Sequence, residues 1–256
     1  MCGIVGYLGS KKAYPILVKG LKRLEYRGYD SAGVALLNGN GIEIYKKEGK
    51  VVQMESVVPV EDSLATLGIG HTRWATHGAP SDRNSHPHYS QSKRIAIIHN
   101  GIIENYASIK EGLSKRGYTF QSDTDTEVLV NLIEDILIHA DVSLAEAVRV
   151  ALNQVVGAYA IAVIEEGNPD QIVVAKKGSP LVIGVGEGEY FIASDATPFI
   201  EYTKQAVYLN EEEVALISLE KGLEIRTIAN ELKRPYVQEL AIEIESIEKG
   251  GYDHFM

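Results

Sequence analysis

The amino-acid sequence predicts an α+β protein whose sheets are antiparallel. Three features lead to this class: short apolar runs recur along the chain, helix signals are grouped together, and an Asn-Gly-Asn-Gly segment joins two apolar runs in the manner of a hairpin. The chain has 256 residues, of which 45% are hydrophobic. A chain of this length buries roughly three quarters of its unfolded surface, so it needs neither a disulfide nor a metal to hold it together.

Apolar runs bounded by glycine or polar residues predict the strands. They comprise residues 4–8, 34–37, 42–45, 67–72 and 94–99 in the first half of the chain, and 158–164, 171–175, 181–185, 190–193, 214–219 and 223–228 in the second. The hairpin turn between the second and third runs is the segment 38–41. Asn100-Gly101 is expected to end the fifth run as another tight turn.

Helical spacing and capping signals predict the helices. Apolar residues predict a helix over 16–24 that stops before Gly28, and a short helix around 109–113 that stops at Gly117. Two further helices should begin at capping boxes, which are Thr124 with Glu127 and Ser143 with Glu146. We also expect a short helix over 194–202, with Pro198 in its first turn. The polar segment 77–93 shows no periodicity, and a long connection of this kind is usually functional.

Composition excludes several classes of function. The formal net charge is −10, which argues against nucleic acid or an anionic membrane as the main partner, because both require clustered Lys and Arg. A single cysteine permits no internal disulfide and favours a reducing compartment. The N-terminus lacks the pattern of a signal peptide, and no apolar run approaches the ~20 residues that span a bilayer. We therefore expect a soluble, cytoplasmic protein.

Cys2 is the residue with the most distinctive position. Elsewhere in a chain, a lone cysteine is usually a small apolar residue in the core. At position 2 its small side chain allows removal of Met1, which would leave a free α-amine on the residue that carries the thiol. An α-amine titrates near ~7.7–8.0, so a fraction of it is an unprotonated base at neutral pH. Nucleophile and general base would then belong to one residue.

Five blocks of sequence resemble one family in their order and spacing. They are Cys-Gly-Ile-Val-Gly at 2–6, Leu-Glu-Tyr-Arg-Gly-Tyr-Asp-Ser-Ala-Gly at 24–33, His-Thr-Arg-Trp-Ala-Thr-His-Gly at 71–78, His-Asn-Gly-Ile-Ile-Glu-Asn at 99–105 and Thr-Asp-Thr-Glu at 124–127. This pattern resembles the class II, or N-terminal-nucleophile, glutamine amidotransferases, and most closely the glutaminase domain of the glucosamine-6-phosphate synthases. The resemblance runs from Cys2 to the end of the chain. It implies a four-layer α/β/β/α sandwich of two antiparallel sheets, in which Cys2 begins a central strand.

The resemblance also implies roles for individual residues. Cys2 attacks the side-chain amide of glutamine, and Asn100 and the Gly101 N–H stabilise the oxyanion that forms. By the same resemblance, Arg73 binds the substrate carboxylate, with Thr76 and His77 nearby, and Asp125 binds its α-ammonium. Arg27 would support the N-terminal region, and Trp74 would act as a gate on the path of ammonia. Chemistry agrees for Arg73, since a guanidinium matches a carboxylate with two parallel hydrogen bonds. Ordinary alternatives are a surface arginine at 73, a helix-start acid at 125 and a core aromatic at 74.

No cofactor or metal is expected. Five histidines, at 71, 77, 86, 88 and 99, suggest zinc, but cysteine ligands and a helical His-x-x-x-His spacing are missing. The histidines are instead expected to order the polar segment around the glutamine pocket. Asp123 and Asp125 lack a third hard ligand for a cation.

The resemblance divides the chain into a glutaminase domain at 2–228 and a segment at 229–256 that leads into a sugar-phosphate isomerase region absent here. We expect glutamine to be hydrolysed to glutamate and ammonia in this half, with fructose 6-phosphate bound only by the missing half of a homodimeric enzyme. Two alternatives stay open. One is the glutaminase domain of another class II amidotransferase, such as the phosphoribosyl-pyrophosphate enzyme or asparagine synthetase. The other is a non-catalytic binding or regulatory domain with the same fold.

Overall fold

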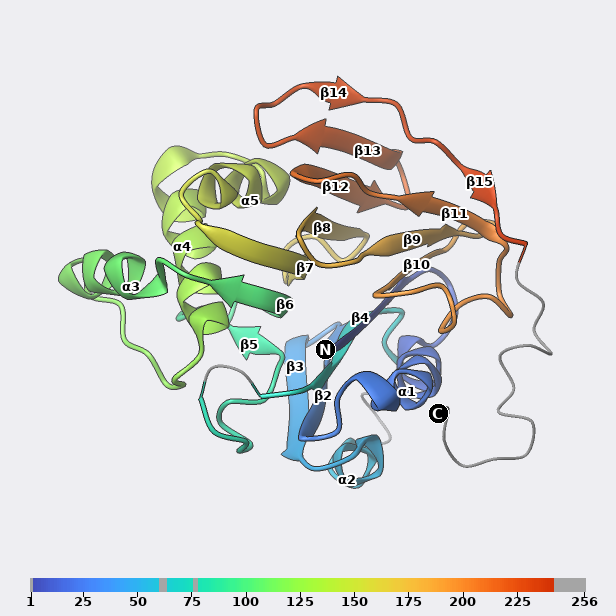
Figure 1. Ribbon diagram of the computed structural model, residues 1–256, viewed down its shortest axis with the longest axis horizontal. Coiled ribbons are helices and arrows are strands. Elements are labelled where there is room, and N and C mark those ends of the chain that lie inside the picture. Colours follow the sequence, from blue (N-terminus) through green and yellow to red (C-terminus); the bar gives the residue numbers. More distant parts are fainter. Residues whose placement is uncertain (1, 60–63, 76–77, 242–256) are drawn as a thin grey trace.

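Two antiparallel sheets lie face to face, and helices cover their outer sides (Figure 1). The structure is a computed structural model, and it describes residues 2–59, 64–75 and 78–241. The layer order is therefore helix, sheet, sheet, helix. This confirms the predicted α+β class and the four-layer sandwich.

The first sheet has eight strands in the order β15-β11-β9-β10-β1-β4-β2-β3. Their bounds are β1 Gly3–Leu8, β2 Ser31–Asn38, β3 Gly41–Glu48, β4 Leu67–Arg73, β9 Val182–Val185, β10 Tyr190–Ala193, β11 Gln205–Tyr208 and β15 Gln238–Glu239. The predicted hairpin is confirmed: Asn38 pairs with Gly41 across a two-residue turn. β1 lies inside the sheet between β10 and β4, so Cys2 stands directly before an interior strand, as expected.

The second sheet has seven strands in the order β14-β13-β12-β8-β7-β6-β5. Their bounds are β5 His88–Tyr89, β6 Ile95–Ile103, β7 Gly157–Glu165, β8 Gln171–Lys177, β12 Glu213–Ser218, β13 Gly222–Thr227 and β14 Leu232–Lys233. The polar segment 77–93 thus contributes one short strand, β5, which pairs with β6.

The helices are α1 Ala13–Arg23, η1 Glu25–Arg27 (a 3₁₀ turn), α2 Val51–Glu55, α3 Tyr106–Lys115, α4 Asp125–Ala140 and α5 Leu144–Leu152. α1 and α2 cover the first sheet, while α4 and α5 cover the second (Figure 1). Both predicted N-caps are confirmed, because Thr124 accepts from the Glu127 N–H and Ser143 accepts from the Glu146 N–H.

Apolar residues form three buried layers. One lies between the sheets and the other two lie between each sheet and its helices. The two-residue period of a strand decides which layer a side chain joins. On β1, Ile4 and Leu8 point between the sheets, whereas Val5 and Tyr7 point toward α1. This alternation also decides which polar side chains can meet at the end of the sandwich.

Two local predictions are wrong. Asn100-Gly101 is not a turn, because β6 continues through both residues and Gly101 pairs with Tyr159 of β7. Sheet pairing over nine residues outweighs the local turn preference of Asn-Gly. The segment 194–202 forms hydrogen-bonded turns rather than a helix. The short elements α2, β5, β11, β14 and β15 were not predicted, since none carries a periodic apolar pattern.

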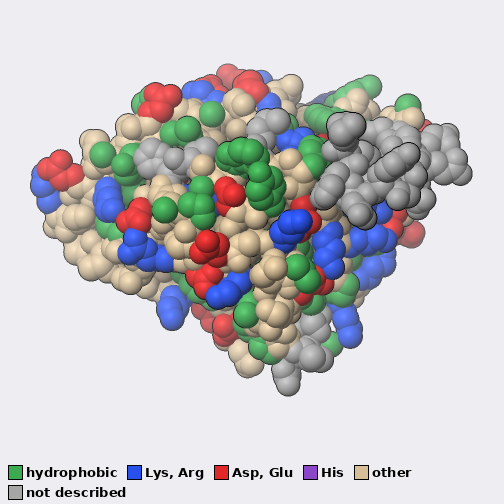
Figure 2. Space-filling model, turned by 60° about the horizontal axis from the view of Figure 1, so that its bottom comes forward, with side chains coloured by type: hydrophobic (Ala, Val, Ile, Leu, Met, Phe, Trp, Pro, Cys, Tyr) green, Lys and Arg blue, Asp and Glu red, His purple; other side chains and the backbone are tan. Residues whose placement is uncertain are grey.

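Residues 229–241 still contribute strands, since β14 pairs with β13 and β15 pairs with β11. The boundary at 228 stays a prediction. Within the described residues no helix is long and apolar enough to cross a membrane. On the face shown in Figure 2, Lys and Arg side chains are interspersed with Asp and Glu side chains.

Candidate active site

Strand periodicity brings the predicted site residues to one end of the gap between the sheets. Cys2 precedes β1 on the face of Ile4, Arg73 ends β4 on the face of Ile69, and Asn100 follows Ile98 on the inner face of β6. They meet at a cavity of about 220 Å³. Drug-sized ligands occupy roughly 300–1,000 Å³, so this cavity suits a molecule of amino-acid size.

The cavity collects seven of the nine predicted residues: Cys2, Arg27, Arg73, Trp74, Asn100, Gly101 and Asp125. Thr76 and His77 lie outside the described residues. The sequence did not assign a cavity position to the other seven lining residues, which are His86, His99, Ile102, Thr124, Thr126, Ser179 and Pro180. Five of these lie within the matching blocks or the polar segment, but no pattern signals Ser179 and Pro180, which stand between β8 and β9.

The Cys2 thiol is held by the backbone of Trp74. The Trp74 N–H donates to Cys2 Sγ over 3.1 Å, and the Trp74 carbonyl lies 3.5 Å from the same sulfur. Burial raises the pKa of the thiol above its ordinary value, while the Trp74 N–H and the Arg73 charge act in the opposite direction. A thiol with a raised pKa is protonated near neutral pH, so it needs a base to become a nucleophile.

Asn100 connects Cys2 to both sheets. Its Nδ2 donates to the Cys2 carbonyl at 3.0 Å and to Ser194 Oγ at 3.2 Å. Ser194 Oγ also accepts from the Ile4 N–H at 2.9 Å, which ties the loop after β10 to β1. The amide nitrogen of Asn100 therefore faces the backbone of Cys2. Ser194 was not predicted, because its role depends on pairing across three strands.

Gly101 has a steric reason to be glycine. Its φ is +128°, and an added Cβ would lie 2.1 Å from the Ala158 carbonyl oxygen of β7. Only glycine therefore lets the strand stay paired with β7 at this point of the cavity wall.

Arg73 and Asp125 are both buried at the cavity wall. Arg73 Nη2 donates to the Gly78 carbonyl at 3.0 Å, and burial lowers its pKa while Cys2, Asp125 and Asp30 act to raise it. Asp125 Oδ2 accepts from the Ile103 N–H at 2.8 Å, so β6 fixes this first residue of α4. A guanidinium and a carboxylate at one cavity offer complementary partners for a zwitterion.

Arg27 supports the rim of the cavity from η1. Its Nε donates to Asp195 Oδ2 at 3.0 Å and to Tyr26 Oη at 3.1 Å. This joins η1 to the segment that follows Ser194. Trp74 is not a core aromatic: its side chain is 45% exposed and meets the Tyr29 ring edge-on at 5.6 Å between centroids.

Four of the five histidines form a buried group at 71, 86, 88 and 99. The His71 and His86 rings stack at 4.3 Å, and His86 meets His88 edge-on at 4.9 Å. Burial lowers the pKa of His71 to about 3 and lowers the pKa values of the other three. Across the part of the chain that the structure covers, no group of three His, Cys, Asp or Glu side chains is placed to hold a metal.

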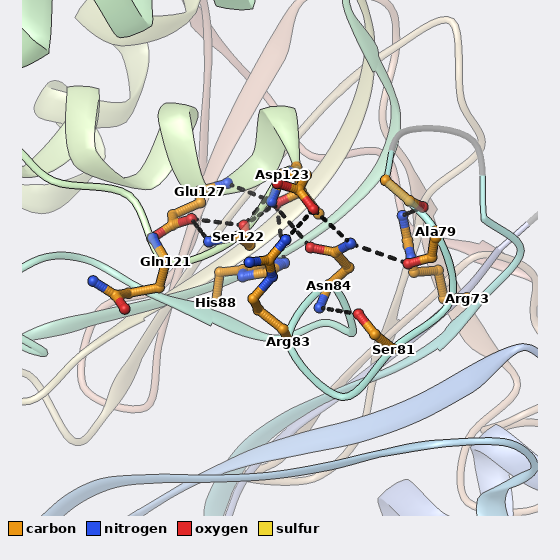
Figure 3. Close-up of polar contacts among 12 residues, drawn as sticks. Arg73, Ala79, Ser81, Arg83, Asn84, His88, Gln121, Ser122, Asp123 and Glu127 are labelled. Atoms are coloured by element: carbon orange, nitrogen blue, oxygen red, sulfur yellow. Dashed lines mark hydrogen bonds and ion pairs between the residues drawn. The ribbon is translucent and has the colours of Figure 1, made fainter.

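The polar segment is fastened to the start of α4 by Asn84 (Figure 3). Its Nδ2 donates to the Ala79 carbonyl at 3.0 Å and to Asp123 Oδ2 at 3.2 Å, and its Oδ1 accepts from the Asp123 N–H at 3.0 Å. The segment whose Gly78 carbonyl accepts from Arg73 is thereby joined to the residues that precede Asp125. On the other side, Lys46 Nζ donates to the Ser85 and Pro87 carbonyls.

These features define a class. An α/β/β/α sandwich with a cysteine directly before an interior strand, at a cavity between the sheets, has the architecture of N-terminal-nucleophile amidotransferases. Comparison with known proteins agrees: residues 71–201 match the family described as glutamine amidotransferase domain. The chain belongs to the glutamine amidotransferase family.

Two relatives are both glutamine–fructose-6-phosphate aminotransferases (isomerizing). That of Bacteroides thetaiotaomicron is 56% identical over 257 residues, covering 100% of this chain and 42% of the relative. That of Thermococcus kodakarensis is 45% identical over 256 residues, again covering 100% of this chain and 42% of the relative. The chain thus spans about two fifths of the length of these relatives.

Solved structures agree on the fold. The glutamine phosphoribosylpyrophosphate amidotransferase of B. subtilis, complexed with ADP and GMP, superposes with a TM-score of 0.77 at 26% identity, over 91% of this chain and 50% of that one. A glutamine aminotransferase class-II domain protein from Silicibacter pomeroyi superposes at 0.59 with 16% identity, over 89% of this chain and 99% of that one, and shows the fold alone.

Proposed function

We propose that this chain hydrolyses glutamine to glutamate and ammonia, with Cys2 as the nucleophile. One observation carries the proposal: a thiol, an amide donor, a guanidinium and a carboxylate line the same cavity of about 220 Å³. Glutamine has a chemical group for each of them. The thiol meets its side-chain amide, and the two charged side chains meet its zwitterionic end.

The reaction begins when the α-amine of Cys2, exposed by removal of Met1, takes the proton of the thiol. Such a base is needed because the pKa of the Cys2 thiol is raised. The thiolate adds to the amide carbon, and the carbonyl oxygen becomes an oxyanion that accepts hydrogen bonds from Asn100 Nδ2 and the Gly101 N–H. Donors of this kind are worth ~3–4 kcal/mol each. The α-ammonium then gives its proton to the amide nitrogen of the substrate, which leaves as ammonia, and water hydrolyses the γ-glutamyl thioester that remains.

Arg73 and Asp125 select the substrate in this scheme. Arg73 binds the α-carboxylate with two hydrogen bonds, and Asp125 accepts from the α-ammonium. The bond from the Ile103 N–H fixes one carboxylate oxygen of Asp125, which supports a precise position for the other. Thr76 and His77 are proposed beside them on the strength of the sequence pattern.

The complete protein is proposed to use the ammonia to make glucosamine 6-phosphate from fructose 6-phosphate, in the cytoplasm and as a homodimer. Relatives named for fructose 6-phosphate reach 56% identity, against 26% for the phosphoribosylpyrophosphate enzyme, and this favours the first acceptor. The isomerase half would bind the sugar phosphate. Supplying fructose 6-phosphate to the complete protein and measuring amino sugar tests this step.

The decisive experiment for the glutaminase is ammonia release from glutamine by the wild type, Cys2→Ala and Cys2→Ser. We expect no release above background from Cys2→Ala, with an unchanged thermal midpoint because Cys2 lies outside the apolar core. Ammonia release by Cys2→Ala at the wild-type rate would refute Cys2 as the nucleophile. Binding of glutamine without hydrolysis by the wild type would favour the non-catalytic alternative.

A further inference from the structure

His71 is a polar side chain in an otherwise apolar layer of the protein. It lies on β4, pairs with Ile4 and Gly33, and is 1% exposed. Its face of the strand is that of Leu67 and Ile69, which are both in the apolar layer between the sheets. An aliphatic residue would suit this layer better unless the imidazole makes a specific bond.

The imidazole does make such a bond. His71 Nε2 lies 2.8 Å from Asn100 Oδ1 and 3.1 Å from the His99 carbonyl oxygen. Both oxygens are acceptors, so Nε2 carries the proton and donates to them. His71 Nδ1, which then holds a lone pair, is buried without a hydrogen-bond partner among the residues that the structure describes.

We propose that His71 is a positioning residue, whose Nε2–H sets the orientation of the Asn100 amide so that Nδ2, and not Oδ1, faces Cys2 and the oxyanion. This inference rests on the proposed glutaminase function and extends it to a residue without contact to the substrate. An amide is nearly symmetric in shape, so packing alone does not distinguish its oxygen from its nitrogen. A donor at the oxygen end and an acceptor at the nitrogen end do: His71 is the donor, and the Cys2 carbonyl is the acceptor.

The network around Asn100 explains why His71 is the constant partner. At rest the two Nδ2 hydrogens go to the Cys2 carbonyl and to Ser194 Oγ. When the oxyanion forms, one of these bonds must be exchanged for it. The bond from His71 to Oδ1 is on the opposite end of the amide and can persist throughout the reaction.

Two further features describe the charge and the orientation of this imidazole. Burial lowers the pKa of His71 to about 3, so the ring is neutral near neutral pH. Its ring also stacks on His86 at 4.3 Å, which holds its plane. The stacked His86 ring opposes rotation of the imidazole, so the same N–H faces Asn100.

The test compares a variant that loses the donor with one that keeps it. His71→Phe retains an aromatic ring of similar shape but has no N–H, whereas the amide nitrogen of His71→Gln reaches about as far as Nε2. We expect His71→Phe to lower kcat for glutamine ~10–100-fold, less than complete loss of an oxyanion donor, with KM changed by no more than about twofold. His71→Gln should recover most of the rate.

A second readout does not depend on activity. In nitrogen-15 NMR, the side-chain amide of Asn100, assigned with Asn100→Ala, should lose its hydrogen-bonded chemical shift in His71→Phe and keep it in His71→Gln. The NMR measurement tests the role of His71 separately from the proposed function, because the Asn100 signal can be compared even if the wild type hydrolyses no glutamine. If His71→Phe does not fold, His71→Asn is used in its place. The shorter amide of asparagine ends near the position of Nδ1, so it cannot donate to Asn100.

The inference is overturned if a folded His71→Phe keeps the wild-type kcat, or if the Asn100 amide signal is unchanged in it. It is also overturned if His71→Gln is as slow as His71→Phe with the same thermal midpoint. That result would mean that the ring itself, and not its N–H, is required.

Discussion

The backbone N–H of Trp74 lies 3.1 Å from the sulfur of Cys2, although 72 positions separate the two residues in sequence. The same residue exposes 45% of its side chain at the cavity. Trp74 therefore contacts the Cys2 sulfur with its main chain, while its indole is partly exposed. A chemical change at the Cys2 sulfur can therefore alter the surroundings of the indole through the backbone of Trp74 itself.

We expect Trp74 fluorescence to respond when the donor site fills. Trp74 is the only tryptophan, so the signal has a single source. Glutamine, or a covalent glutamine analogue on Cys2, should shift the emission spectrum. Cys2→Ala is the control for the covalent analogue and should give no shift with it. An unchanged spectrum in fully labelled wild type would show that Trp74 does not sense the site.

In the complete enzyme, Trp74→Ala is expected to uncouple the two reactions. Loss of the indole should let ammonia escape, so that more glutamine is consumed than amino sugar is formed. Hydrolysis of glutamine in the present chain should be spared. The measurement is the ratio of glutamate to amino sugar, and a ratio of one in the mutant would return Trp74 to an ordinary surface aromatic.

Blocking the α-amine of Cys2 should be nearly as damaging as removing its thiol. A positioned general base contributes ~100–10,000-fold, and a retained Met1 converts this amine into a peptide nitrogen. Intact mass identifies the processed and unprocessed forms, whose rates are then compared. Full activity in protein that retains Met1 would rule out the amine as the base.

Arg73→Lys should weaken glutamine binding more than it slows the chemistry. Lysine keeps the charge but loses the paired hydrogen bonds, and a bond to a charged group is worth ~1.5–3 kcal/mol, so KM should rise ~10–100-fold. Asparagine is shorter by one methylene, and with its α-groups bound its amide falls short of Cys2, a misplacement that can cost ~100-fold. Steady-state kinetics with both substrates provide the measurement. Equal rates for asparagine and glutamine would contradict this mode of binding.

Asn84→Ala should loosen the segment that holds Arg73. It removes the partly buried bonds to the Ala79 carbonyl and to Asp123, each worth ~0.5–1.5 kcal/mol. We expect a higher KM for glutamine and a lower thermal midpoint. Arg83→Ala is the matched control, because it removes only an exposed ion pair to Asp123, and such pairs contribute little. Similar effects from the two variants would argue against a special role for Asn84.

The four buried histidines should make the protein sensitive to mild acid. Burial lowers their pKa values in the folded state, so below the unfolded value of ~6.5 the unfolded chain binds more protons. Stability is fully present above that pH and falls below it, by up to ~1.4 kcal/mol per pH unit for each histidine. Urea unfolding at pH 7.5, 6.5 and 5.5 measures the slope. His71→Gln should reduce it by about one histidine's share, and an unchanged slope would contradict a buried neutral His71.

The sequence alone determined the fold class, most strands and the identity of the main site residues. Apolar patterns are local, so they can be recognised without knowing which strand or helix packs beside them. The strand at 4–8 and helix α1 are examples. The five blocks supply the side chains that we propose for attack, oxyanion stabilisation and substrate binding. Seven of the nine named residues line one cavity, and the other two are outside the described residues.

Only the tertiary structure decided how those side chains are oriented. Asn100-Gly101 has the local preference of a turn, yet pairing with β7 keeps it in a strand, and the amide of Asn100 then meets His71 from another sheet. Ser194 and Asn84 act through bonds to residues distant in sequence, which no local pattern encodes. Hydrogen bonds between sheets depend on register and on which face a side chain occupies, and both are settled only when the strands pair.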